Sequence, residues 1–176
     1  TLTGTYGSWS VVESSGAWTY TLSNSDTDTD ALDGGDSVTE TLTMVASDGT
    51  TTASHDVVVT VGGDDDAPTS STPSTQAGAE DATFTGYTVS DFPFTDVDTD
   101  DSALISITIT VLESSGDLES SADGSNWADV SANDVILNAN IQHLRLAPVA
   151  DAVADITFTF KVNDGTQSSS AYVMTT

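Results

Sequence analysis

The chain has 176 residues, of which 28 are acidic and only 2 are lysine or arginine, so its formal net charge is −26. Such a chain cannot build the clustered basic patch that binding to nucleic acid or anionic lipid requires. It contains no cysteine, which excludes a disulfide framework and thiol chemistry. No stretch reaches the roughly 18 consecutive apolar residues of a membrane span. We therefore expect no nucleic-acid partner and no membrane insertion.

Apolar residues alternate with threonine and serine through much of the chain. An acidic chain with few aromatic residues can be disordered, but a hydrophobic content of 37 % argues against disorder here. A period of two is typical of half-buried strands. It is clearest in residues 39–45, 56–61, 105–111 and 156–162. The sequence therefore predicts an all-β protein.

The first half predicts a short β-sandwich domain over residues 1–63. Residues 6–12 and 17–22 are expected to form a hairpin, followed by an Asp-rich loop and two long strands. About four strands enclose so little core that such a domain is marginal unless a metal ion, a partner or a further strand stabilises it.

A domain boundary is expected where Gly62 and Gly63 end a strand and Pro68 removes a backbone donor. Residues 64–79 are then an acidic, polar linker. Residues 80–176 predict a second β-sandwich with about seven to nine short strands separated by Asp, Gly, Asn and Ser turns. One short helical turn is expected within residues 133–142.

Four motifs of the first half have a characteristic order and spacing: residues 4–9 (Gly-Thr-Tyr-Gly-Ser-Trp), 16–22, 31–36 and 47–49. Together they resemble the VCBS-type repeat of large bacterial RTX-type surface adhesins. The opening strands of that family have no counterpart ahead of Thr1, so the resemblance implies a first domain without its N-terminal strands.

The second half carries another set of motifs, at residues 80–81, 91–98, 126–130, 144–148 and 162–165. They are similar to the cadherin-like repeats of the same adhesins. The resemblance implies two tandem immunoglobulin/cadherin-like β-sandwich domains with calcium at their junctions. It also implies a role as extender modules of a giant surface or matrix protein.

Acidic residues gather in runs at the expected strand ends, and clusters of oxygen ligands without cysteine suit Ca²⁺, which takes six to eight oxygens at about 2.3–2.6 Å. In the cadherin-like pattern, calcium draws its ligands from the linker, a Glu-Asp pair and an Asp-x-Asp loop, with further carboxylates at the base of a domain. The matching residues are Asp64, Asp65, Asp66, Glu80, Asp81, Asp96 and Asp98, with Asp48 or Asp164 at the base. Asp26, Asp28 and Asp30 form a weaker candidate set. The alternative for every run is a solvated turn.

No constellation of catalytic residues stands out. The two histidines, His55 and His143, fall in different predicted domains, whereas a catalytic triad needs converging groups. We expect no enzymatic activity. Trp9 and Trp18 are expected in a core rather than on a sugar-binding platform, and Trp127, in a turn, is the better candidate for an exposed aromatic.

The sequence thus predicts a calcium-stabilised structural or extender module of a secreted or cell-surface adhesin or matrix filament, acting in adhesion or biofilm assembly. Its expected partners are neighbouring repeats of the same protein or other copies of itself, including donation of a strand to the first domain. The alternative is a calcium-dependent carbohydrate-binding module attached to an adhesive or polysaccharide-active protein, with polysaccharide as the partner.

Overall fold

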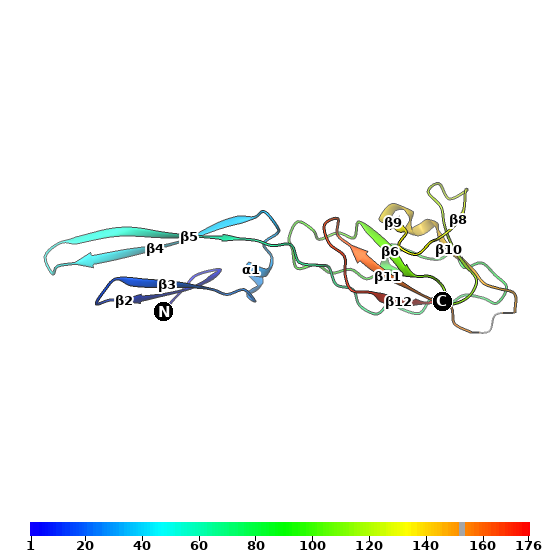
Figure 1. The fold of residues 1–176 in the computed structure, drawn as a ribbon, viewed down its shortest axis with the longest axis horizontal. Coiled ribbons are helices and arrows are strands. Elements are labelled where there is room, and N and C mark those ends of the chain that lie inside the picture. Colours follow the sequence, from blue (N-terminus) through cyan, green and yellow to red (C-terminus); the bar gives the residue numbers. More distant parts are fainter. Residues whose placement is uncertain (152–153) are drawn as a thin grey trace. The chain divides into compact units, whose positions relative to one another are not determined.

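The computed structural model describes residues 1–151 and 154–176, and within them strands predominate over a few short helical segments (Figure 1). The prediction of an all-β protein is confirmed. The chain forms two compact units, one made of residues 1–66 with 97–100 and the other of residues 67–96 with 101–176. Each unit is described separately below.

The first unit contains two antiparallel sheets, of order β1-β2-β3 and β4-β5. Its strands are β1 (Leu2–Thr3), β2 (Gly7–Val12), β3 (Ala17–Leu22), β4 (Ser37–Ser47) and β5 (Thr52–Gly62). The predicted hairpin and the two long strands are therefore confirmed.

The Asp-rich loop of the first unit contains a helical turn, α1 (Thr27–Asp30), which the sequence analysis took for irregular loop. Asp26 begins this helix, because its side chain accepts a hydrogen bond from Asp28 N at 3.2 Å. Aspartate is a favoured residue at this capping position. Asp26, Asp28 and Asp30 are all exposed.

The apolar core of the first unit is small. Trp9 is its largest buried side chain, and Leu32 and Val61 are the other buried apolar residues there. The rings of Tyr20 and Trp18 pack on Trp9, with centroids 4.8 Å and 5.6 Å away. Trp18 nevertheless stays 42 % exposed, so the two sheets cover each other incompletely.

The second unit also has two antiparallel sheets, of order β10-β7-β8 and β12-β11-β6-β9. Its strands are β6 (Ser106–Val111), β7 (Asp117–Ser120), β8 (Ala128–Asp129), β9 (Val135–Leu137), β10 (Leu144–Ala147), β11 (Thr157–Asn163) and β12 (Tyr172–Thr175). The 3₁₀ segments are η1 (Val89–Asp91) and η2 (Asn138–His143), and η2 supplies the helical turn that the sequence predicted.

The core of the second unit is large and rich in aromatic residues. Along β11, Phe158, Phe160 and Val162 are buried, while the residues between them are only half-buried. Phe160 meets Phe92 edge to face at 4.9 Å, and Tyr87 meets Phe158 at 5.9 Å. Such pairs add stabilisation beyond the burial of area. The period of two read from the sequence is thus the period of core packing.

The segment read as a linker, residues 64–79, packs with the second unit from residue 67 onward. Thr69 pairs with Thr95 in an isolated bridge, and Gln76 N donates to Thr175 O at 2.9 Å. Tyr172 also accepts a hydrogen bond from Ser70 N at 3.1 Å. These contacts join residues distant in sequence, so no local sequence pattern predicts them.

We expect Trp9→Ala to destabilise the first unit by about 3–5 kcal/mol, the usual cost of removing a buried aromatic side chain. The second unit has its own core and should keep its amide protection. Denaturant unfolding followed by residue-resolved hydrogen exchange measures both effects. Trp18→Ala is the matched control and should cost less, because Trp18 is partly exposed. Equal losses from the two substitutions would contradict the assignment of Trp9 as the core residue.

Candidate functional site

Among the described residues there is one ion pair, between Arg145 Nε and Glu119 Oε2 at 2.7 Å. The hydrogen bond and charge of Arg145 lower the pKa of Glu119 despite its partial burial. The Arg145 guanidinium also lies over the ring of Trp127, 4.1 Å from its centroid. Arginine is thus already engaged, and the other carboxylates need different partners.

Three Asp-Gly dipeptides form the same turn. In each, the aspartate accepts hydrogen bonds from the backbone N–H groups of the residues two and three positions after it in the chain. These aspartates are Asp48, Asp123 and Asp164, with N···O distances of 2.6–2.9 Å. Each following glycine has a positive φ. Hydrogen bonds to the ionised form lower the pKa of Asp48 and Asp123. The largest contribution comes from the backbone N–H three positions later, which belongs to Thr51 and Asn126 respectively.

Asp164 differs from the other two turn aspartates because it is only 4 % exposed. Burial raises its pKa, but the hydrogen bonds from Gln167 and Thr166 outweigh that effect and the pKa is lowered. Its Oδ2 is buried and accepts no hydrogen bond among the described residues. Thr166 Oγ1 lies 2.8 Å from Asp164 Oδ1 and 3.1 Å from Asp101 Oδ2, so a second carboxylate is close by.

A larger acidic group lies in the first unit and includes the segment Val97–Asp100, which belongs to that unit. Backbone N–H groups tie its members together: Gly34 N donates to Asp65 at 2.7 Å, Asp66 N to Asp98 at 2.7 Å and Asp100 N to Asp33 at 2.9 Å. Asp33 and Asp98 are only 8 % and 2 % exposed. We call Asp33, Asp65, Asp66, Asp98 and Asp100 the Asp33 cluster.

Gly63 makes the close approach within the Asp33 cluster possible. A Cβ atom at this position would collide with the backbone carbonyl groups of Leu32 and Asp33. Gly62 and Gly63, which predicted a strand end from the sequence, therefore have a second role: Gly63 lets the chain after β5 pass directly beside the backbone of Leu32 and Asp33. A larger residue at position 63 would push these segments apart.

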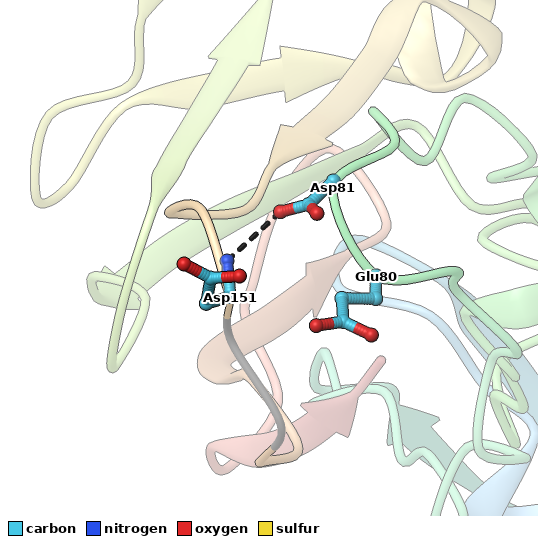
Figure 2. Close-up of side chains that lie close together, drawn as sticks. All are labelled: Glu80, Asp81 and Asp151. Carbon is cyan, nitrogen blue, oxygen red and sulfur yellow. Dashed lines mark hydrogen bonds between the residues drawn. The ribbon is translucent and has the colours of Figure 1, made fainter.

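A third acidic group lies in the second unit and consists of Glu80, Asp81 and Asp151 (Figure 2). One carboxylate oxygen of each lies within 4.8 Å of the others, close enough to hold a metal ion, although all three residues are exposed. Asp151 N donates to Asp81 Oδ1 at 2.8 Å, which fixes the two segments together. The sequence analysis named Glu80 and Asp81 but not Asp151.

The structure separates residues that the sequence analysis placed at one junction. Glu80 lines a cavity of about 450 Å³ with Asp155 and Ile156, just before β11 begins, whereas Asp164 follows the end of β11. A strand of that length puts them roughly 20 Å apart. Asp48 lies in the turn between β4 and β5 of the first unit.

The linker and the Asp-x-Asp loop do come together, because Asp66 and Asp98 share a hydrogen bond. Asp64 is exposed, and Asp96 is half-buried directly after the bridge between Thr69 and Thr95. Asp33 lies in the 31–36 motif but was not predicted as a ligand from the sequence. Its only local signal was the Asp-Gly-Gly turn that follows.

The chemistry of these groups is that of oxygen ligands alone. An ionised carboxylate has about four lone-pair sites, so it can accept a backbone hydrogen bond and still coordinate a cation. The buried Oδ2 of Asp164, with no donor among the described residues, fits a cation better than it fits a solvated turn. These residues suit a hard cation.

The remaining candidates lie elsewhere. His55 is exposed on β5 in the first unit, and His143 ends η2 in the second unit. Trp9 is buried, as predicted, but the same prediction was wrong for Trp18, which is exposed at the surface of β3. Trp127 is half-buried rather than exposed, because Arg145 stacks on its ring.

Comparison with protein-family models, with curated proteins and with solved structures finds no match. None of the helices within residues 1–151 and 154–176 has the length and apolarity needed to cross a membrane.

The lowered pKa of Asp123 predicts a pH-dependent contribution to stability. Its folded pKa lies below the unfolded value of about 3.9, so its contribution is fully present above about pH 4 and is lost as the pH falls through the folded pKa. The difference in melting temperature between the wild type and Asp123→Asn should therefore shrink below about pH 4. Acidification also relieves general charge repulsion, but equally in both proteins. A difference that stays constant from pH 7 to pH 2.5 would contradict this assignment.

Proposed function

We propose that this chain is a calcium-stabilised structural module, an extender segment of a secreted or cell-surface adhesin or matrix filament. The observation that carries the proposal is the burial of Asp33, Asp98 and Asp164 in a chain with only two lysine or arginine residues. Removing an ionised carboxylate from water costs several kcal/mol even after the protein relaxes. Backbone donors offset part of that cost, and a divalent cation would offset more.

Calcium fits the donor set better than softer ions do. The Asp33 cluster and the pair of Asp101 and Asp164 offer oxygen ligands only, which calcium prefers and which zinc and copper sites rarely consist of. Carboxylates packed closely repel one another, and a divalent ion between them reverses the sign of the interaction. The ion would thereby stiffen the loops that the carboxylates hold.

The structural role follows from where such an ion acts. The first unit has a small core, so binding energy there contributes directly to its stability. Extracellular calcium is near the millimolar range at which weak extracellular modules bind it. The resemblance of the sequence motifs to VCBS-type and cadherin-like repeats supports the same role, with further repeats of the long protein as the neighbours.

Calcium titration tests the proposal. At ten to a hundred times the dissociation constant, each site should stabilise the protein by about 1.4–2.7 kcal/mol. We expect calorimetry to show binding and the melting temperature to rise in millimolar calcium and fall with chelator. Magnesium at the same concentration controls for general screening of charge. An identical melt in calcium, magnesium and chelator would overturn the proposal.

Two matched substitutions locate the ion. Asp164→Asn and Asp48→Asn alter the same type of turn, and the asparagine oxygen can still accept the backbone hydrogen bonds. We expect Asp164→Asn to weaken calcium binding at least tenfold and Asp48→Asn to leave it unchanged, because only Asp164 is buried beside a second carboxylate. Asp98→Asn should act like Asp164→Asn if the Asp33 cluster also binds. Equal effects of all three would point to diffuse attraction by the net charge.

A further substitution separates the exposed acidic group from the buried ones. Asp151→Asn should lower the number of calcium ions bound while leaving the calcium-dependent rise in melting temperature intact, since exposed charges contribute little to stability. Calorimetric stoichiometry and thermal melts on the same samples measure the two effects. Loss of the thermal effect in Asp151→Asn would place the stabilising ion at Glu80, Asp81 and Asp151 instead.

A further inference from the structure

A separate feature of the first unit is the buried carboxylate of Glu40, which is 9 % exposed. Its Oε1 accepts hydrogen bonds from Thr5 N and from Tyr6 N, the latter at 2.9 Å. Its Oε2 is buried and has no hydrogen-bond partner of normal geometry among the described residues. The hydroxyl of Tyr20 lies nearby, but its buried oxygen does not reach hydrogen-bond geometry either. The carboxylate is therefore only half satisfied.

The Glu40 carboxylate lines a cavity of about 430 Å³ between two strands. Leu2 and Thr3 of β1 line one side of it, and Thr41 and Leu42 of β4 line the other. The cavity thus lies where the edge of one sheet approaches the edge of the other.

Both strands beside the cavity are edge strands. Among the described residues, β1 pairs only with β2, and β4 pairs only with β5. The long free edge of β4 presents backbone N–H and C=O groups, which can template the addition of another strand. Val38, Glu40 and Leu42 face the inside of the unit along this edge, and Val38 and Leu42 are only half-buried.

Glu40 has no lysine or arginine within its own unit to pair with. The first unit contains no lysine or arginine, because the only two in the sequence are Arg145 and Lys161. Arg145 already pairs with Glu119, and Lys161 lies in β11 between two paired strands. A lysine or arginine beside Glu40 would therefore belong to a bound segment outside residues 1–176.

We propose that the free edge of β4 binds an extended segment of another protein that carries an inward-facing arginine or lysine opposite Glu40. Opposite charges directly across two strands stabilise their pairing. On the same face, residues two positions before and after the cation lie beside Val38 and Leu42, so they must be apolar. The partner segment therefore has the alternating pattern apolar–polar–cation–polar–apolar.

A second copy of this chain does not meet that requirement. The residues two positions from Lys161 are Thr159 and Asn163, which are polar, and those two positions from Arg145 are His143 and Ala147. The net charge of −26 also opposes self-association, whereas it attracts a basic partner. Binding at β4 does not require calcium, so its test is independent of the test of the proposed function.

Three capped peptides test the proposal with the intact chain, in calcium and in chelator. The first is Thr-Val-Thr-Arg-Thr-Val-Thr, which places arginine and both valines on one face. The second replaces arginine by citrulline, which has nearly the same shape and no charge. The third, Thr-Val-Arg-Val-Thr-Val-Thr, keeps the charge but moves it to the opposite face. We expect calorimetry to show the first peptide binding at least tenfold more tightly than either of the others.

Two further measurements locate the binding. Hydrogen exchange should show new protection of β4 amides when the first peptide binds. Glu40→Gln should weaken that peptide at least tenfold, while Glu13→Gln, which removes a charge from an exposed turn, should not change its affinity. Equal affinity for the first and third peptides would mean non-specific attraction and would overturn the proposal. No measurable binding of the first peptide, or protection elsewhere than on β4, would overturn it as well.

Discussion

The structure depends on how carboxylates are held in a chain that has few cations. Backbone N–H groups do most of this work: Asp98 accepts from Asp66 N, and Asp33 accepts from Asp100 N. Hydrogen bonds to an ionised carboxylate are stronger than those between neutral groups. They also join segments that are far apart in sequence. The acidic residues therefore connect distant segments of the chain through hydrogen bonds, although their charges repel one another.

The two units depend to different degrees on hydrogen bonds to carboxylates. The second unit buries a continuous aromatic and aliphatic core around Phe158 and Phe160, so it resembles an ordinary small β domain in its source of stability. The first unit buries mainly Trp9, Leu32 and Val61. With so little apolar burial, the hydrogen bonds of Glu40 and of the Asp33 cluster form a larger share of what holds it together. Burial raises the pKa of Glu40, but the backbone hydrogen bonds from Tyr6 N and Thr5 N help to lower it below its usual value, so the charge is kept.

The strands were predictable because their signal is local. A period of two in residues 105–111 and 156–162 marks β6 and β11 almost to their ends, since the same alternation produces the buried face of each strand. Residues 67–79 have no such period, and their packing with the second unit comes from single contacts such as that of Gln76 with Thr175. Sequence alone could not place them.

The acidic groups were predictable as residue types but not as partners. The cadherin-like pattern put Asp66 and Asp98 in one set, and in the structure Asp66 N donates a hydrogen bond to Asp98. Asp151 joins Glu80 and Asp81 only through the folding of the chain, and nothing near it in the sequence suggests this. The alternation of residues 39–45 puts Glu40 on the same face of β4 as Leu42. Its hydrogen bonds with Thr5 N and Tyr6 N join residues far apart in sequence, so no local pattern predicts them.

The number of carboxylates in a group decides which cation can satisfy it. Calcium needs six to eight oxygens and is favoured where several carboxylates lie together, as Glu80, Asp81 and Asp151 do. Glu40 is a single carboxylate, and one of its oxygens is already engaged by two backbone donors. It is better matched by one guanidinium or ammonium group, which can donate to the remaining oxygen without needing further acidic ligands. The same excess of negative charge thus favours a metal ion at one place and a basic side chain at another.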